Sequence, residues 1–547
     1  MPGAASVHAL LTALDPEQRA AAALPDGPAQ IIAPAGSGKT TTLIARLGVL
    51  IDRGHEPERI LVLTFNRDAA GELRARIASR LAPLVPSAER IEVRTLHAIG
   101  RRILLDSGWR GRLIAERSPL LRAARRAVAL ASQDAPTLPT LDELDTAVSA
   151  VKLGGRSVCE ATAAVIAEYQ TLLDRRCALD FDDLVARAVA LLRGDAALRA
   201  TWQARFNHVL VDEFQDVDAA QLRLISLLAE PERNVFAVGD DDQTIYAWRL
   251  ADVRRILDFD RVYPDARRVM LATNYRCPAA VVGASRRLIG VNLERFAKPI
   301  DAAPGSCADP RDVATFPLDV SDWPHRLAEL AKRRADAGSR VCFLARTRAE
   351  LMPVALALIR RGVRHAMAAA TPIEAGPVIN LMDVLRHTEG EPYAVIEAAR
   401  RARGWHRAAQ EDDLSPDEHD AVDALLGWAS AYRDGREFVT SFDAARARLS
   451  ELRRPDAPVH LMTVHGAKGL EFPLVVVVGF EEDRFPNRRA VVSAADPARA
   501  LEDERRLAYV ALTRASEQLV LAFHPDRPSR FVAELGVPIR RPRVRRR

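Results

Sequence analysis

The chain of 547 residues is too long for a single hydrophobic core, so we expect several domains. Hydrophobic residues make up 48% of it and charged residues 28%, which is typical of a globular protein and excludes a largely disordered one. The net charge of +5, from 78 basic and 73 acidic residues, is too small to indicate a nucleic-acid partner by itself.

Neither a membrane span nor a secretion signal is predicted. The longest apolar run, residues 474–478, suits a buried strand and is far shorter than the roughly 18 residues that cross a bilayer. The N-terminus lacks the basic start and apolar core of a signal peptide. The five cysteines are scattered without a C-x-x-C pair, which argues against a zinc or iron–sulfur site. We therefore expect a cytoplasmic protein without membrane contacts.

A helix is predicted to begin at Pro16. Asp15 is a suitable N-cap, and Pro16 and Glu17 suit the first helical turn. The amide of Gln18 can both donate to and accept from the edge of a base. Alone, Gln18 would be taken for a surface residue, but its place shortly before a phosphate loop favours a nucleotide contact.

That loop lies between a predicted buried strand, which ends at Ile32, and an apolar periodic helix from Leu43 to Ile51. Its glycines let backbone N–H groups surround a phosphate at a helix N-terminus. Lys39 can reach the β- and γ-phosphates, and the Thr40 hydroxyl can bind Mg²⁺. The residues expected to contact the nucleotide are Ala33, Pro34, Ala35, Gly36, Ser37, Gly38, Lys39, Thr40 and Thr41.

The loop departs from the strict pattern at Ala33, where a glycine is usual. The alternative is a turn of small residues beside an exposed lysine. We favour the phosphate loop because a strand precedes it and a helix follows it. ATP and Mg²⁺ are the cofactors that this interpretation implies.

Two further buried strands are predicted at residues 60–65 and 91–93. Strands that alternate with helical runs indicate a doubly wound parallel sheet, whose ligands lie at the carboxyl ends of the strands. Phe65 and His97 lie at or just beyond two of these ends. They are either core residues or surfaces for a nucleic-acid strand.

Residues 101–207 lose the strand signal, and their helical periodicity predicts a helical insertion. Three carboxylates stand together near its end, at Asp180, Asp182 and Asp183. They suggest a metal site, but we favour the commoner explanation, the Asp-rich first turn of a helix.

An acidic pair follows the next predicted strand, residues 208–211. A phosphate-loop NTPase needs one carboxylate on Mg²⁺ and another that orients or deprotonates the attacking water. We assign the first role to Asp212 and the second to Glu213. An acidic pair after a strand is common by itself, but with Lys39 and Thr40 upstream it indicates ATP hydrolysis.

The strand predicted at residues 235–238 leads into a polar and aromatic segment. Gln243 is suited to sensing the γ-phosphate. Tyr246, Trp248 and Arg249 form a stacking and cationic group that can hold bases without reading their sequence. A buried Trp–Tyr pair is the alternative, which the neighbouring Asp residues and amide disfavour.

Together these segments resemble superfamily 1 helicases, in particular the UvrD/Rep group of ATP-driven DNA helicases. The resemblance covers nearly the whole chain, from about Leu14 to about Ala515. The matching segments are residues 14–18 (glutamine motif), 33–40 (phosphate loop), 211–216 ("DEFQD"), 239–249 ("GDDDQSIYGWRGA"), 274–276, 463–472 ("H-x-x-KGLEF") and 502–515 ("EERRLFYVALTRA").

The resemblance implies roles that the residues alone do not give. Tyr275 would stack on adenine, and Glu471 would contact the ribose. Arg276 and Arg514 would reach the γ-phosphate as arginine fingers. His465 would contact the DNA backbone.

Arg276 and Arg514 lie far from Lys39 in the chain, so we expect a second sheet, built from strands at residues 341–345, 474–478 and 519–523. Arginine fingers supply charge only when a cleft closes, so ATP binding would close two lobes and hydrolysis would reopen them. Arg346 is either a strand-end surface charge or part of that cleft, and we favour the surface charge.

Four departures from the family pattern stand out. Thr41 replaces an Arg that many relatives carry beside adenine, and Asp68 replaces a Lys that contacts the DNA backbone. Residues 371–455 leave only a short helical insertion, so translocation is a firmer expectation than processive unwinding. The Arg-rich end would bind phosphates, dock a partner or serve as a disordered solubilising tail.

The sequence thus predicts an α/β protein with two RecA-like parallel-sheet motor domains and helical insertions. The expected segments are 1–100 and 181–270 (first motor domain), 271–370 and 456–535 (second motor domain), 101–180 and 371–455 (insertions) and 536–547 (tail).

We expect a DNA helicase or translocase that moves 3′ to 5′ on single-stranded DNA in DNA repair, recombination or replication restart. The direction rests on the resemblance alone. Single-stranded and tailed duplex DNA, and a repair protein, are the expected partners, and the protein would act as a monomer or a DNA-induced dimer. The alternatives are a translocase that strips proteins from DNA, an ATP-switched binding factor on DNA or RNA polymerase, and an ATPase without nucleic acid. The hydrolysis groups argue against the binding factor, which need not keep all of them.

Overall fold

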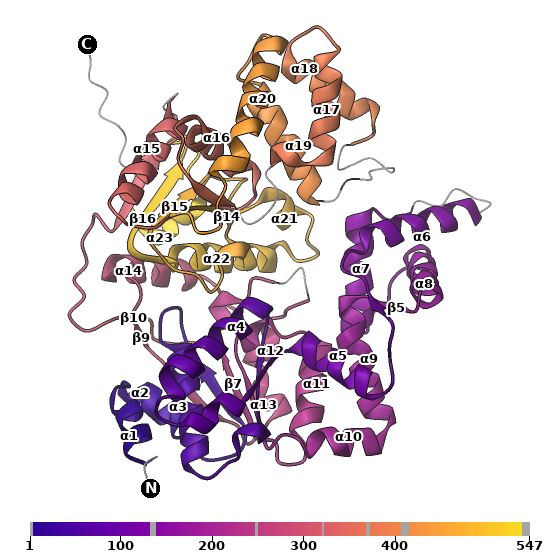
Figure 1. Ribbon diagram of the computed structural model, residues 1–547. Helices are drawn as coiled ribbons and strands as arrows, with labels where there is room; N and C mark the ends of the chain where they lie inside the picture. Colours follow the sequence, from indigo (N-terminus) through magenta and orange to yellow (C-terminus); the bar gives the residue numbers. More distant parts are fainter. Residues whose placement is uncertain are drawn as a thin grey trace. The chain divides into compact units, whose positions relative to one another are not determined.

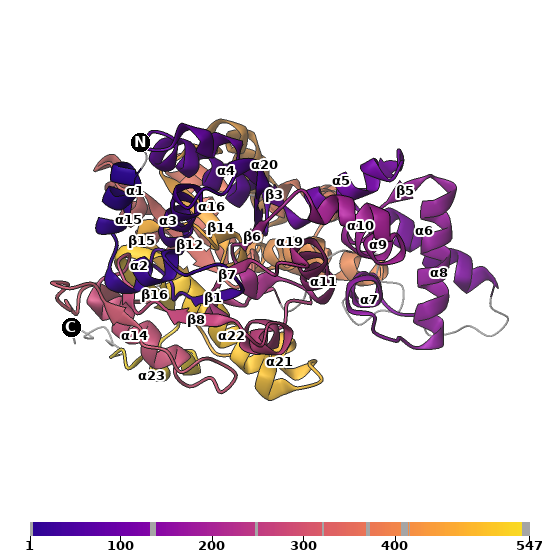
Figure 2. The same cartoon turned by 90° about the horizontal axis from the view of Figure 1, so that it is seen from below.

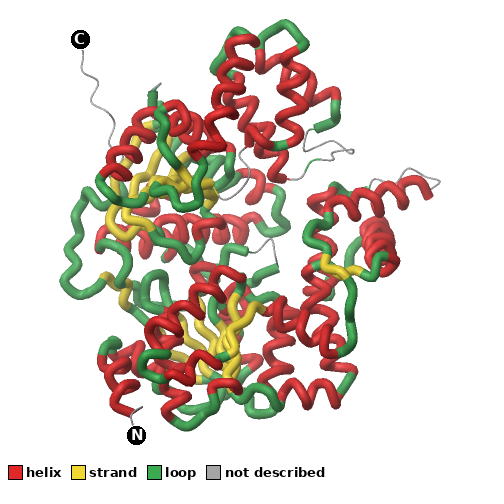
Figure 3. The backbone as a smooth tube through the Cα atoms, in the orientation of Figure 1, coloured by secondary structure: helices red, strands yellow, loops and turns green. Residues whose placement is uncertain are grey.

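The computed structural model describes residues 4–131, 138–246, 250–319, 322–367, 372–405, 414 and 416–538. The chain divides into two compact units. The first comprises Met1–Pro139, Glu143–Tyr275 and Glu294–Asp301, and the second comprises Thr140–Asp142, Arg276–Leu293 and Ala302–Arg547. Each unit holds a six-stranded parallel sheet flanked by helices, so the predicted α/β class with two RecA-like domains is confirmed (Figure 3).

The sheet of the first unit has the strand order β3-β2-β6-β7-β1-β8, and every neighbouring pair is parallel. Its strands are β1 (Ala29–Ile32), β2 (Ile60–Thr64), β3 (Glu92–Thr95), β6 (His208–Val211), β7 (Val235–Gly239) and β8 (Arg267–Met270). In a parallel sheet all carboxyl ends lie at one edge, so the segments that follow β1, β6 and β7 emerge side by side.

Both faces of this sheet are buried, which explains its nearly continuous apolar strands. Successive residues point to opposite faces, so Ile31 and Ile32 belong to different cores. Helices α3 (Lys39–Asp52) and α4 (Arg67–Arg76) supply the core around Ile31. Helices α5 (Leu96–Asp106), α9 (Phe181–Gly194) and α11 (Ala219–Ala229) supply the core around Ile32.

Helices α6 (Ser118–Ala131), α7 (Leu141–Gly154) and α8 (Glu160–Arg175) form a separate group in the chain segment between β3 and β6. Two views show α6 and α8 on the side of the first unit away from α1–α3 (Figures 1 and 2). Asp180 caps α9 through a capping box with Asp183, so the predicted Asp-rich helix start is confirmed. Lys152 Nζ lies 3.0 Å from Asp180 and 2.9 Å from Asp183, which balances this buried negative charge.

The remaining elements of the first unit connect these parts. They are α1 (Ala4–Thr12), α2 (Pro16–Ala22), η1 (Pro57–Arg59), η2 (Ile77–Leu81), η3 (Pro86–Arg90), β4 (Arg112–Leu113), β5 (Ala178–Leu179), α10 (Ala196–Gln203), η4 (Phe214–Asp216), η5 (Asp241–Gln243), α12 (Arg254–Leu257), α13 (Phe259–Val262) and β9 (Thr273–Asn274); β10 (Asp301–Ala302) pairs with β9 where the chain leaves this unit.

The second sheet has the order β11-β16-β15-β12-β14-β13, again with parallel neighbours only. Its strands are β11 (Val313–Pro317), β12 (Val341–Ala345), β13 (His365–Met367), β14 (Val459–Thr463), β15 (Phe472–Val478) and β16 (Ala515–Phe523). The three strands predicted for a second sheet are therefore confirmed. Helices α15 (Trp323–Asp336) and α16 (Met352–Arg360) cover one face, and α14 (Ala279–Ile289) and α22 (Pro497–Leu512) contact β16 from another side.

A helical region interrupts the second unit between β13 and β14, and it shares a core of buried residues with α16. It consists of α17 (Gly376–Arg386), α18 (Pro392–Ala402), α19 (Pro416–Ala429) and α20 (Gly435–Leu452), drawn in orange in Figure 1. Phe438 and Phe442 of α20 pack on Trp428 of α19, with ring centroids 5.1 and 5.8 Å apart. The other elements of this unit are η7 (Ala349–Leu351), η8 (Pro372–Glu374), η9 (His465–Ala467), α21 (Arg488–Val492) and α23 (Arg530–Leu535).

Among the described residues, no helix is both long and apolar enough to cross a membrane. The predicted basic tail falls mostly outside the described residues, which end at residue 538.

Candidate nucleotide-binding site

The residues predicted to bind and hydrolyse the phosphates lie at the carboxyl edge of the first sheet. The phosphate loop follows β1, Asp212 and Glu213 follow β6, and Gln243 follows β7. Strand β7 lies between β1 and β6 in the sheet, so the three segments are neighbours although they are far apart in sequence. This arrangement brings together the lysine, the carboxylates and the amide that phosphate transfer needs.

The phosphate loop depends on two glycines with left-handed backbone, Gly36 (φ 71°) and Gly38 (φ 81°). A Cβ on Gly38 would also lie 2.5 Å from Nε2 of Gln18, so a side chain there would displace Gln18. Lys39 begins α3, is half-buried and donates from Nζ to the carbonyl of Ala33 at 3.0 Å. The alternative of an exposed lysine beside a turn is therefore wrong.

Gln18 and Tyr275 both contact this loop. Gln18 is buried, so its interpretation as a surface residue is wrong; Nε2 donates to the carbonyl of Ser37 at 2.9 Å. Asp15 caps α2 and also accepts a hydrogen bond from the Tyr275 hydroxyl at 2.8 Å. The backbone N–H of Tyr275 donates to the carbonyl of Gly36 at 2.9 Å. An exposed aromatic ring and a loop-contacting amide thus lie on one side of the phosphate loop.

The acidic pair sits in a strained turn. Glu213 adopts φ 54°, an uncommon conformation for a non-glycine residue, and its N–H donates to Oδ1 of Asp212 at 3.0 Å. Gln215 Nε2 donates to the Glu213 carboxylate. Burial, together with the charge of Glu213, raises the pKa of Asp212 to about 7.

The chemistry of this group fits a hard divalent cation. The Thr40 hydroxyl and the Asp212 carboxylate are oxygen ligands of the kind that Mg²⁺ prefers, and they follow β1 and β6, the two strands that flank β7 in the sheet. Burial disfavours the charged form of Asp212, and a bound cation would stabilise that form.

A hydrogen-bonded network joins the acidic pair to Gln243. Gln215 is fully buried and accepts the N–H of Asp240 at 2.9 Å, while its amide nitrogen contacts Glu213. Gln243 donates from Nε2 to Oδ2 of Asp240 at 2.7 Å. Sequence reasoning missed Gln215 and Asp240 as site residues, although both stand inside the matched motifs.

Three of the residues predicted to contact DNA, Phe65, His97 and Tyr246, lie in the segments that follow β2, β3 and β7 of the same sheet. The rings of Phe65 and Tyr246 stack with centroids 4.8 Å apart, and His97 meets Phe181 edge-on at 6.0 Å. Phe65, His97 and Tyr246 are each half-buried, so none is a fully buried core residue. Trp248 and Arg249 lie outside the described residues.

In the second unit, Arg276, Glu471 and Arg514 lie together. Arg276 Nε donates to Glu471 at 2.7 Å, and its Nη1 donates to the carbonyl of Thr513 at 3.3 Å. Arg514 is buried and donates from Nη1 to the carbonyl of Leu470 at 3.2 Å. Glu471 and Arg514 directly precede β15 and β16, so they lie at the amino ends of these strands.

His465 and Arg346 follow the carboxyl ends of β14 and β12. His465 lies half-buried in η9. Arg346 Nη2 lies 2.8 Å from Oε1 of Glu504, whose side chain is 6% exposed. The prediction that Arg346 is a surface charge is therefore wrong, because this ion pair fastens the end of β12 to α22.

Comparison with known proteins decides the family. The family model of the UvrD/REP helicase N-terminal domain matches residues 14–264, and that of the UvrD-like helicase C-terminal domain matches residues 437–526. The ATP-dependent DNA helicase UvrD2 of Mycobacterium tuberculosis is 30% identical, over 96% of this chain and 81% of that protein. The chain belongs to the UvrD/REP helicase family.

Other relatives of this UvrD/REP family member are similar over comparable lengths. The ATP-dependent DNA helicase PcrA of Leuconostoc citreum is 28% identical, over 97% of this chain and 86% of its own. The putative ATP-dependent DNA helicase YjcD of Bacillus subtilis is 26% identical, over 97% and 82%. The resemblance on which the motif assignments rest is thus confirmed.

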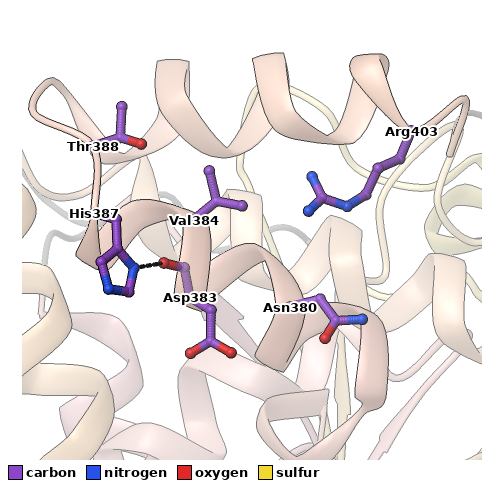
Figure 4. A pocket seen from close by; sticks show the side chains of 6 residues that line it. All are labelled: Asn380, Asp383, Val384, His387, Thr388 and Arg403. Atoms are coloured by element: carbon purple, nitrogen blue, oxygen red, sulfur yellow. Dashed lines mark hydrogen bonds between the residues drawn. The ribbon is translucent and has the colours of Figure 1, made fainter.

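A separate pocket of about 480 Å³ lies in the helical region of the second unit (Figure 4). It is lined by Asn380, Asp383, Val384, His387, Thr388 and Arg403. The ring of His387 already bonds the carbonyl of Asp383, with 2.7 Å between Nδ1 and the oxygen. None of these six residues is a predicted site residue, so we assign the pocket no part in the nucleotide chemistry of this UvrD/REP family member.

Proposed function

We propose that this chain is an ATP-dependent DNA helicase that moves 3′ to 5′ along single-stranded DNA, in DNA repair, recombination or replication restart. One observation carries the proposal: the phosphate loop, the acidic pair and Gln243 occupy neighbouring strand ends in a UvrD/REP family member. The relatives' names, which describe ATP-dependent DNA helicases, support the activity.

In this proposal the nucleotide is held by the first unit. Backbone N–H groups of residues 33–38 and the ammonium group of Lys39 bind the β- and γ-phosphates. Tyr275 stacks on adenine, and Gln18 and Thr41 lie beside the base. The family resemblance adds a ribose contact from Glu471 of the second unit. Mg²⁺, held by Thr40 and Asp212, would neutralise charge that develops on the phosphates.

In the proposed hydrolysis each polar group has one role. Glu213 takes a proton from the water that attacks the γ-phosphorus, and the bond to the bridging oxygen of ADP breaks to release phosphate. Gln243 senses the γ-phosphate. The family resemblance assigns Arg276 and Arg514, both of the second unit, to the γ-phosphate, where they would stabilise the charge of the transition state.

DNA would lie along the carboxyl edge of the first sheet, where the rings of Phe65 and Tyr246 stack. Phe65, Tyr246 and Trp248 would stack on bases, and His97, Arg249 and His465 would contact the strand. Stacking tolerates every base, so the protein would move along a strand without sequence preference. Single-stranded and tailed duplex DNA are the substrates that this arrangement would take, by a monomer or a DNA-induced dimer.

The direction is tested with two duplexes that carry the same single-stranded tail at either the 3′ or the 5′ end. A 3′-to-5′ helicase unwinds the 3′-tailed duplex with ATP and Mg²⁺ and leaves the 5′-tailed duplex intact. Unwinding of the 5′-tailed duplex alone would refute the proposed direction. The Lys39→Ala variant is the control, because it removes the phosphate-binding ammonium group.

A second candidate function has a specific observation in its favour. The helical region of α17–α20 spans only residues 376–452, and its core of buried residues also includes residues of α16. A protein with such a short region could translocate, or switch with ATP, and unwind little. DNA-stimulated hydrolysis without unwinding of either tailed duplex would favour this candidate.

A further inference from the structure

A fully buried lysine of the first unit contacts the loop that carries Gln243. Lys298 lies in the segment Glu294–Asp301, where the chain returns to the first unit after passing through Arg276–Leu293 of the second. Its side chain has no exposed surface. Lys298 Nζ lies 2.7 Å from Asp240 and 3.0 Å from Asp242, and it also donates to Asp241.

Lys298 contacts three buried carboxyl groups. Asp240, Asp241 and Asp242 are consecutive and have no exposed side-chain surface. Burial raises the pKa of Asp241 to about 6. For Asp240 burial acts in the same direction, but Lys298 and then Lys39 outweigh it and lower the pKa of this carboxyl. Asp240 therefore depends on Lys298 for its charge.

Asp240 in turn fixes Gln243. One carboxylate oxygen of Asp240 accepts from Lys298 and the other accepts from Nε2 of Gln243, each at 2.7 Å. An ionised carboxylate only accepts hydrogen bonds, so it selects the nitrogen end of the Gln243 amide. Because an amide nitrogen carries two hydrogens in one plane, the first bond also sets the direction of the second.

We propose that Lys298 is a positioning residue that, through Asp240, orients the amide of Gln243 toward the γ-phosphate. The inference rests on the proposed function, in which Gln243 senses that phosphate. Lys298 touches neither nucleotide nor DNA in this account. Its loss should therefore slow turnover and leave the affinity for ATP nearly unchanged.

The matched control comes from the same segment. Arg295 binds Asp242 through two hydrogen bonds, of 2.9 and 2.8 Å, and its side chain is also largely buried. Arg295 does not bind Asp240, the partner of Gln243, through any contact that the structure gives. A purely structural role of the segment would make the two substitutions equivalent.

The test measures kcat and KM for ATP, with saturating single-stranded DNA, for Lys298→Met and Arg295→Met. We expect Lys298→Met to lower kcat at least tenfold with KM within threefold of wild type, and Arg295→Met to keep kcat within threefold. Adding Lys298→Met to Gln243→Ala should lower kcat by less than a further threefold, because both changes remove one interaction. A normal kcat in Lys298→Met, an equal loss in Arg295→Met, or multiplying losses in the double variant would overturn the inference.

A folding failure of Lys298→Met does not end the test. Asp240→Asn keeps the shape of the side chain but replaces one acceptor oxygen with a donor, so it cannot accept from both Lys298 and Gln243. The inference expects a tenfold loss of kcat in Asp240→Asn with an unchanged KM, and a normal kcat would overturn it. Absence of DNA-stimulated hydrolysis in the wild-type protein would overturn the proposed function itself, whereas wild-type activity with an unaffected variant would overturn the inference alone.

Discussion

The rings of Phe65 and Tyr246 stack at the carboxyl edge of the first sheet, with centroids 4.8 Å apart and planes inclined by 20°. Phe65 follows β2 and Tyr246 follows η5, so the pair joins two segments that are 181 positions apart in sequence. Two half-buried rings in one stack present an apolar surface of the kind on which bases pack.

Replacing Phe65 with Ala should weaken the coupling of ATP hydrolysis to DNA. Base–aromatic stacking is worth about 1–3 kcal/mol per base, so the concentration of single-stranded DNA that gives half-maximal stimulation should rise about tenfold. Hydrolysis without DNA should stay unchanged, because the ring is not expected to touch the nucleotide. Tyr393→Ala, which removes an exposed ring from the helical region of the second unit, is the control. Equal DNA dependence of Phe65→Ala and wild type would contradict the assignment.

The glycine at position 38 should be essential for nucleotide binding. An Ala there would combine strain at φ 81° with a Cβ 2.5 Å from Gln18, so we expect Gly38→Ala to abolish detectable binding of a fluorescent ATP analogue. Gly54 also has positive φ, 92°, but a Cβ added there would meet nothing within 4 Å. Gly54→Ala should therefore lose stability from strain and still bind the analogue. Normal binding by Gly38→Ala would show that the loop does not hold the nucleotide.

Glu213 should be needed for hydrolysis and not for binding. A general base contributes typically 10²–10⁴-fold, so Glu213→Gln should lower kcat by at least about a hundredfold. The substitution keeps the size of the side chain and its contact with Gln215, so nucleotide affinity should stay within threefold of wild type. Single-turnover hydrolysis and equilibrium binding measure the two effects separately. Retained turnover would mean that another group takes the proton.

Stability should fall in mild acid because of His208. This buried residue begins β6, and its Nε2 lies 3.2 Å from Nδ1 of His55. Burial is the largest cause that lowers the pKa of His208, to about 4. The charges of His55, Arg46 and Arg53 lower it too, and the charge of Asp26 opposes them. Since the unfolded chain takes up this proton near pH 6.5, the stabilisation is complete above that pH and is lost as the pH falls toward 4. The expected loss between pH 7 and pH 5 is about 2 kcal/mol.

Denaturant unfolding at pH 7 and pH 5 measures this loss as a difference between two proteins. His208→Gln keeps a polar side chain that does not titrate in this range, so its free energy of unfolding should change less with pH than that of wild type. Because the other titrating groups are present in both proteins, their effect cancels in the comparison. Equal pH dependence in the two proteins would exclude His208 as the source.

Five of the six strands in the sheet of the first unit could be predicted from sequence because they are short apolar runs. Strand β8 (Arg267–Met270), which begins with two exposed arginines, was missed. In the second sheet the prediction found β12, β15 and β16, which are almost wholly buried. It missed β11, β13 and β14. Strands β11 and β14 are partly exposed and carry polar residues, and β13 has only three residues, so none of them gives a continuous apolar signal.

Site residues that belong to a sequence motif could be predicted. Site residues whose partners lie far away in the sequence could not. Lys39, Asp212 and Gln243 belong to matched segments, and their roles came from the resemblance and from chemistry. Lys298 stands 58 positions after Asp240, on a segment that returns from another unit, so no local pattern marks it. Arg346 was misassigned for the same reason, because its partner Glu504 lies 158 positions away.

A motor built on this phosphate loop is best tested by the rate of ATP hydrolysis with and without single-stranded DNA, measured for the wild-type protein and for Lys39→Ala. We expect DNA to stimulate hydrolysis by the wild-type protein strongly, and Lys39→Ala to hydrolyse almost no ATP in either condition. Hydrolysis that does not respond to DNA, or that survives in Lys39→Ala, would contradict a DNA-driven motor built on this phosphate loop.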